Sequence, residues 1–95
     1  MNLQDNHTEN KAVQTQLLFS TTEGKVISLQ IASGEQLKEH LSKVPALLVC
    51  VSGNAVYTDE KEAIITLKSG DYINIEPDVK HRIDAIEESN FLLIK

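Results

Sequence analysis

The sequence predicts an all-β protein, an antiparallel sandwich or barrel of about eight or nine short strands. Short apolar or alternating runs recur at intervals of about ten residues, and turn-forming residues separate them. No segment combines helical spacing of apolar residues with helix-ending signals. Nothing could therefore serve as the crossover helices of a doubly wound fold. The expected strands are residues 16–20, 25–31, 46–51, 55–58, 63–68, 72–75, 81–86 and 91–94.

The second run shows the alternation most clearly. Ile27, Leu29 and Ile31 fall on one face of a strand, and the polar residues between them fall on the other. The Gly-containing segment 21–24 joins this run to the first as a hairpin. Residues 35–43 are expected to be extended or a loop, because Gly and Pro bound them and their apolar residues lack helical spacing.

The stretch 67–83 organises the C-terminal half. Gly70-Asp71 supplies one turn, residues 72–75 a short strand, and Pro77-Asp78 a second turn. His81 then opens the next strand, where a side chain can point into a cavity. The charged run 59–62 is most simply a solvated hairpin tip.

Composition limits the function classes. The formal charge of −5 and the absence of Trp argue against nucleic acid, which requires clustered Lys and Arg. Anionic membrane surfaces are disfavoured for the same reason, and no apolar stretch approaches the ~20 residues of a membrane helix. The single cysteine, Cys50, cannot form an internal disulfide.

We expect two regions. Residues 1–14 are polar and predict a flexible tail in which His7 has no role, and residues 15–95 predict a single domain. The N-terminus has neither a basic start nor an apolar run, so we expect no signal peptide and a cytoplasmic protein.

Two stretches resemble the cupin family of small double-stranded β-helix barrels, also called jelly-roll barrels. In the second, Gly70, Pro77 and His81 follow the order and approximate spacing of the family's glycine, proline and histidine. Glu76 stands where the proline is usually found, and Asp78 where a glycine is common. The likeness implies the cupin fold; it does not transfer an activity.

The first half-motif is degraded. Gly34, His40 and Gly53 match it, but Ser42 stands at the position of the second histidine and Ala46 at that of the glutamate. The resemblance thus implies a metal site in which His40 and His81 supply two ligands, for a divalent ion such as zinc, nickel or iron, with Cys50 as a candidate third ligand. A useful catalytic site needs at least three protein ligands.

Strand alternation predicts the lining of the barrel. Its interior would hold two imidazoles, a hydroxyl and a thiol among aliphatic groups, which suits a small, mostly apolar ligand with one polar end. The simpler alternatives are that His40 faces solvent, His81 holds a turn and Cys50 is a buried small hydrophobe. The expected pocket residues are His40, Ser42, Ala46, Leu48, Cys50, His81, Ile83 and Ala85.

Two functions remain open. One is a small cupin-domain protein that binds a small molecule in the barrel, as a sensor or accessory module. The other is a minimal metal-dependent enzyme of oxygenase or isomerase type that uses His40 and His81. In either case residues 46–51 and 91–94 are apolar on both faces, and we expect a homodimer that buries their outer faces by sheet packing.

Overall fold

The computed structural model describes residues 1–95 and contains nine strands in two sheets. The only helix is the short 3₁₀-helix η1 (Leu3–Asn6), and no helix is long and apolar enough to cross a membrane. The predicted all-β architecture is confirmed. The strands are β1 (Val13–Ser20), β2 (Lys25–Ile31), β3 (Gln36–His40), β4 (Ala46–Ser52), β5 (Asn54–Asp59), β6 (Ile64–Lys68), β7 (Tyr72–Ile75), β8 (His81–Ala85) and β9 (Ser89–Ile94).

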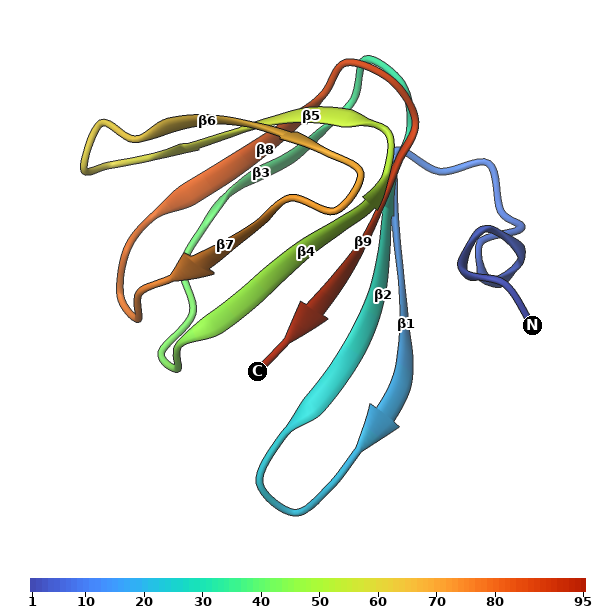
Figure 1. The fold of residues 1–95 in the computed structure, drawn as a ribbon, viewed down its shortest axis with the longest axis horizontal. Coiled ribbons are helices and arrows are strands. Elements are labelled where there is room, and N and C mark those ends of the chain that lie inside the picture. Colours follow the sequence, from blue (N-terminus) through green and yellow to red (C-terminus); the bar gives the residue numbers. More distant parts are fainter.

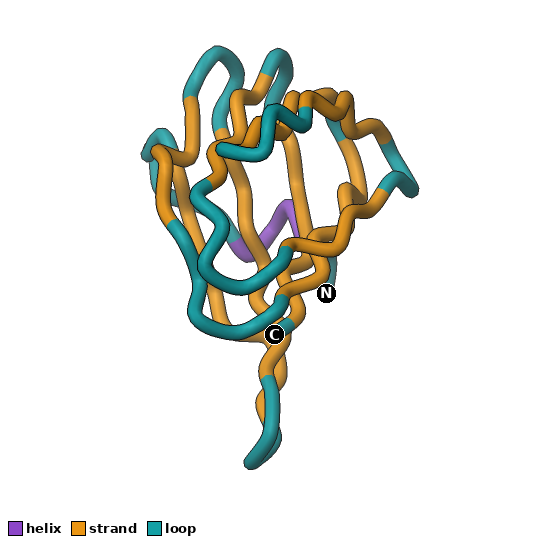
Figure 2. The backbone as a smooth tube through the Cα atoms, turned by 90° about the vertical axis from the view of Figure 1, so that its left-hand side faces the viewer, coloured by secondary structure: helices purple, strands orange, loops and turns teal.

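The strands form two facing antiparallel sheets (Figure 1). One sheet has the order β1-β2-β9-β4-β7, and the other has the order β3-β8-β5-β6. Consecutive strands therefore alternate between the sheets along much of the chain, which is the jelly-roll arrangement. The β1–β2 hairpin projects beyond the rest of the molecule (Figure 2).

The core fills the space between the sheets. Leu29 and Ile31 on β2 are buried, as the alternating pattern predicts, while Ile27 nearer the projecting hairpin tip is only half-buried. Phe91 of β9 is the largest side chain that is fully buried. The cluster of 13 buried apolar residues comprises Leu29, Ile31, Ala46, Leu48, Cys50, Ala55, Tyr57, Leu67, Ile73, Ile75, Ile83, Ala85 and Phe91.

Gly53 joins β4 to β5 and is required there for two reasons. Its φ of 108° lies in the left-handed region that side chains avoid. A Cβ at this position would also lie 2.6 Å from both the Glu88 carbonyl oxygen and the Ser89 Cα. By contrast, a Cβ at Gly70, where φ is 90°, would meet nothing within 4 Å.

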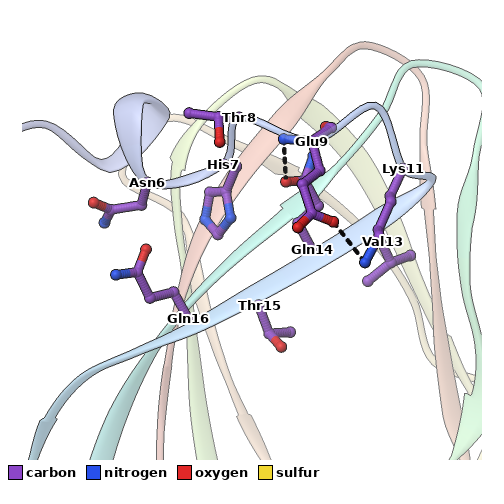
Figure 3. A pocket seen from close by; sticks show the side chains of 9 residues that line it. All are labelled: Asn6, His7, Thr8, Glu9, Lys11, Val13, Gln14, Thr15 and Gln16. Atoms are coloured by element: carbon purple, nitrogen blue, oxygen red, sulfur yellow. Dashed lines mark hydrogen bonds and ion pairs between the residues drawn. The ribbon is translucent and has the colours of Figure 1, made fainter.

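The N-terminal segment differs from the sequence expectation in one respect. The prediction that His7 has no role is wrong, because its ring is 9% exposed and its Nε2 lies 2.7 Å from Ser28 Oγ on β2. The Gln14 side-chain amide also bonds both the N–H and the carbonyl of Glu9 (Figure 3). These contacts hold the segment against the five-stranded sheet; the flexibility of residues 1–14 stays a prediction.

Most strand ends lie within about one residue of the expected bounds, and two strand starts differ by more. β1 begins at Val13, and β9 begins at Ser89 rather than after a turn through Asn90. Ser89 and Asn90, the two polar residues of β9, are almost fully buried, which the sequence pattern does not indicate. The Asn90 side chain accepts from Gln30 Nε2 and donates to Ser52 Oγ, so hydrogen bonds to neighbouring strands offset its burial.

Candidate functional site

His81 lies at the start of β8, where its ring is 4% exposed. Its Nδ1 is 3.0 Å from the carbonyl oxygen of Val79. Because a carbonyl oxygen only accepts, Nδ1 must carry the proton of this hydrogen bond. In the neutral ring, Nε2 therefore keeps a free lone pair.

His40 ends β3 and is the Cα partner of His81 in the β3–β8 ladder. The two ring centroids lie 4.3 Å apart with the ring planes tilted by 58°. His40 Nδ1 lies 3.0 Å from the Lys38 carbonyl oxygen, so this ring also donates through Nδ1. The prediction that the fold brings these two imidazoles together is confirmed by the geometry, although His40 itself is exposed.

The surroundings of His81 keep its ring neutral. Burial lowers the pKa of His81 below its ordinary value, and the neighbouring His40 acts in the same direction. The hydrogen bond to Val79 and the charge of Asp59 oppose this shift without reversing it. At pH 7 the ring is thus an uncharged acceptor at Nε2.

Tyr57 and Asp59 of β5 complete the surroundings of His81. The Tyr57 ring stacks on the His81 ring at a centroid distance of 5.7 Å and a plane angle of 26°. The Tyr57 hydroxyl donates to Asp59 Oδ2 at 3.0 Å. Burial, and then the hydrogen bond to Asp59, raise the pKa of Tyr57, so the phenol remains a donor.

Asp59 is fixed by the turn that follows β5. Its Oδ1 accepts the backbone N–H groups of Lys61 at 2.9 Å and Ala63 at 3.1 Å. Desolvation pushes the pKa of Asp59 upward, but these bonds and the one from Tyr57 outweigh it and hold the pKa below its ordinary value. The carboxylate is therefore ionised and oriented.

A cavity of about 190 Å³ lies beside these groups, between the β5–β6 turn and β7. Tyr57, Asp59 and Glu76 line it, and the Lys61 ammonium forms an ion pair with Glu76 at its edge. The sequence pattern missed this feature, because the charged run 59–62 has the composition of an ordinary solvated hairpin tip. The one available signal was the acidic residue at the expected proline position, Glu76.

The remaining predicted pocket residues fall into two groups. Ser42 lies half-buried in the loop after β3, where its carbonyl accepts the Asp78 N–H at 2.8 Å. The others pack into the hydrophobic core: Ala46, Leu48, Cys50, Ile83 and Ala85. Of the surface cavities, only one near Pro45 touches this set, through Ala46. That these residues line a ligand pocket stays a prediction.

The donor set fits a metal ion poorly. The chain contains no group of three or more His, Cys, Asp or Glu side chains arranged to hold one. Asp59 already accepts three hydrogen bonds. The two imidazoles are thus the only ligands of the expected cupin set that the structure places together.

Comparison with known proteins was made by sequence and by structure. The sequence matches no family model and no curated protein. A cupin superfamily protein from Desulfitobacterium hafniense matches with a TM-score of 0.83 at 22% identity, over 94% of this chain and 80% of that chain. A conserved Streptococcus pyogenes protein of unknown function matches with a TM-score of 0.83 at 19% identity, over 99% of this chain and 82% of that chain. A cupin-like protein from Thermotoga maritima matches with a TM-score of 0.78 at 21% identity, over 87% of this chain and 67% of that chain.

These similarities define the class of fold. The protein has the cupin fold, and the resemblance carried by Gly70, Pro77 and His81 is confirmed at that level. Identities of this size establish the architecture alone, since one fold supports many chemistries.

Proposed function

We propose that the protein is a small cupin that binds a small molecule at the His40–His81 end of the barrel and acts as a sensor or accessory module. The observation that carries the proposal is the 4.3 Å separation of the two rings, each tied through Nδ1 to a backbone carbonyl. Such rings are oriented by the backbone and present unprotonated Nε2 atoms as acceptors. A ligand with a hydroxyl or N–H donor suits this arrangement.

Binding is favoured over metal-dependent catalysis because of the residues at the other cupin ligand positions. Ser42 and Ala46 replace the second histidine and the glutamate, and Ala46 is buried among apolar groups. Two imidazoles hold a divalent ion weakly unless other ligands complete its shell.

The second candidate is a minimal metal-dependent enzyme of oxygenase or isomerase type, holding zinc, nickel or iron through His40 and His81. One observation favours it. Metal-ligating histidines typically donate their second ring nitrogen to a carbonyl or carboxylate, and both rings do so here.

Metal analysis of protein purified without a His tag separates the two candidates. The binding function predicts protein that remains free of metal after incubation with excess zinc, nickel or iron and desalting. Stoichiometric metal that is lost in His81→Ala would contradict it and support the enzyme. His7→Ala is the matched control, because it removes a histidine that lies against the outer face of the other sheet.

We also propose that two copies of this chain associate through the outer face of the five-stranded sheet. Cross-strand partners place one apolar residue from each of four strands in a row on this face: Phe19, Val26, Ile94 and Leu47. Cross-strand partners form a second row of Leu92, Val49 and Tyr72, in which Tyr72 is 64% exposed. These rows carry no charged side chain, so contact there places no like charges directly against each other.

Light scattering at micromolar concentration tests the association. We expect a dimer that dissociates at least about tenfold more readily in Phe19→Lys or Tyr72→Lys, because each buries an unpaired ammonium in the interface. Ile64→Lys is the control, since Ile64 is 74% exposed on the other sheet. A monomeric wild-type protein would contradict the proposal.

A further inference from the structure

We propose that the cavity between the β5–β6 turn and β7 binds a polyhydroxylated part of the ligand that carries no negative charge. This inference rests on the proposed function, because the cavity adjoins the imidazole pair. It assigns roles to Asp59 and Glu76, which bind the ligand's hydroxyl groups, and to Lys61, which holds Glu76 in place.

The cavity and the imidazole pair are parts of one end of the barrel. Tyr57 lines the cavity and stacks on the His81 ring. Val79 also lines the cavity, and its carbonyl oxygen accepts the His81 Nδ1 proton. In Figure 1 this is the end where the β5–β6 turn and the β7–β8 loop lie, and where β8 begins. A ligand seated in the cavity therefore lies one side chain away from His81.

The charges around the cavity disfavour an anionic ligand. Glu76 is neutralised by its ion pair with Lys61. The Asp59 carboxylate accepts hydrogen bonds from Tyr57 and from two backbone N–H groups. These donors are uncharged, so Asp59 keeps its negative charge and would repel a carboxylate ligand, and the one ammonium at the cavity is already paired with Glu76.

The hydrogen-bonding groups favour a ligand that donates. A carboxylate offers about four acceptor sites, so Asp59 retains one beyond the three bonds that it accepts. Glu76 retains Oε1, since its bond to Lys61 uses Oε2. The Tyr57 hydroxyl is a donor already engaged with Asp59. The Lys61 ammonium uses one of its three N–H donors on Glu76 and keeps two. Hydroxyl groups donate to the free acceptors and can also accept from Lys61, without adding charge.

The volume limits the size of the bound part. A water molecule occupies roughly 30 Å³ in the liquid, so a cavity of about 190 Å³ holds roughly six non-hydrogen atoms. A three-carbon polyol is of this size.

An NMR titration with three probes of equal heavy-atom count tests the inference: glycerol, 3-amino-1,2-propanediol and lactate. The reporters are the amide signals of Lys61 and Ala63, whose N–H groups bond Asp59, and the ring signals of His81. We expect glycerol to shift the two amides, and lactate to bind about tenfold more weakly, since its carboxylate would lie beside Asp59 without a free counter-ion. The cationic analogue should bind at least as tightly as glycerol, because Asp59 has no cationic partner.

Variants separate this inference from the proposed function. Glu76→Ala should weaken glycerol binding several-fold, Glu76→Gln should largely restore it by keeping a carbonyl acceptor, and Glu88→Ala should leave it unchanged. Asp59→Asn should also weaken binding, with the amide spectrum checking its fold.

If glycerol shifts only the His81 ring, the imidazole site stands and the cavity assignment is wrong. Lactate binding as tightly as glycerol, or no response to glycerol, would overturn the inference.

Discussion

The imidazole rings of His40 and His81 lie 4.3 Å apart, although one side chain is exposed and the other is buried. The pairing of β3 with β8 creates this contact, since the two residues are Cα partners at the end of that ladder. Two imidazolium charges at this distance would repel each other. The protonation of His81 therefore depends on His40.

Replacing His40 should raise the pKa of His81. His40 is one of the groups that lower this pKa, after burial. In His40→Gln the burial remains, so the pKa should move only part of the way toward its ordinary value. NMR titration of the His81 ring protons measures the shift, and a pKa that falls in the variant would contradict the contact.

Stability should decrease as the pH falls below the histidine range. Burial lowers the pKa values of both His7 and His81 in the folded protein from the ordinary value of 6.5. Below pH 6.5 the unfolded chain then binds more protons than the folded one, and the unfolding free energy declines by at most about 1.4 kcal/mol per pH unit for each histidine. Above pH 6.5 both states hold neutral rings, and this contribution to the slope vanishes.

Urea unfolding over this pH range checks the prediction. His7→Gln and His81→Gln should each remove part of the slope, because each removes one titrating group. A midpoint that does not change between neutral and mildly acidic pH would show that neither ring is held neutral by the fold.

Gly53→Ala should destabilise the fold much more than Gly70→Ala. Both glycines have positive φ, which costs another residue about 1–2 kcal/mol. At Gly53 the added Cβ also meets the backbone at Ser89, adding about 1–3 kcal/mol for overpacking. Denaturant unfolding compares the two variants, and equal losses would contradict the packing of the β4–β5 turn against Ser89.

Cys50 should be unreactive in the folded protein. The thiol is fully buried in the core, and burial followed by the charge of Asp71 raises its pKa. Because the thiolate is the reactive form, a thiol reagent should label Cys50 only after denaturation. Rapid labelling of the native protein would show that this part of the barrel is open to solvent.

The sequence pattern was sufficient for the fold class because short strand-like runs recur at intervals of about ten residues, with turn residues between them. Leu29 and Ile31 point inward as their spacing predicts, and the turn glycines lie where strands end. The pattern failed where polar groups are buried by partners distant in sequence. Nothing in the polar segment around His7 indicates that its ring forms a hydrogen bond with Ser28.

The candidate site was only partly predictable for the same reason. The cupin resemblance located His40 and His81, and strand pairing brings them together. The resemblance could not reveal that Asp59 and Glu76 line one cavity, because a charged turn and a carboxylate that follows a strand both look solvent-exposed in sequence. Five of the expected pocket residues pack in the core, since alternation alone does not show how tightly small side chains fill an interior.

The tautomers of His40 and His81 test the central claim most directly. Long-range ¹H–¹⁵N correlation spectra at neutral pH distinguish a protonated Nδ1 from a protonated Nε2. Both rings should carry their proton on Nδ1, leaving Nε2 as the acceptor. A proton on Nε2 of either neutral ring would mean that its carbonyl bond is absent and that the acceptor pair does not exist.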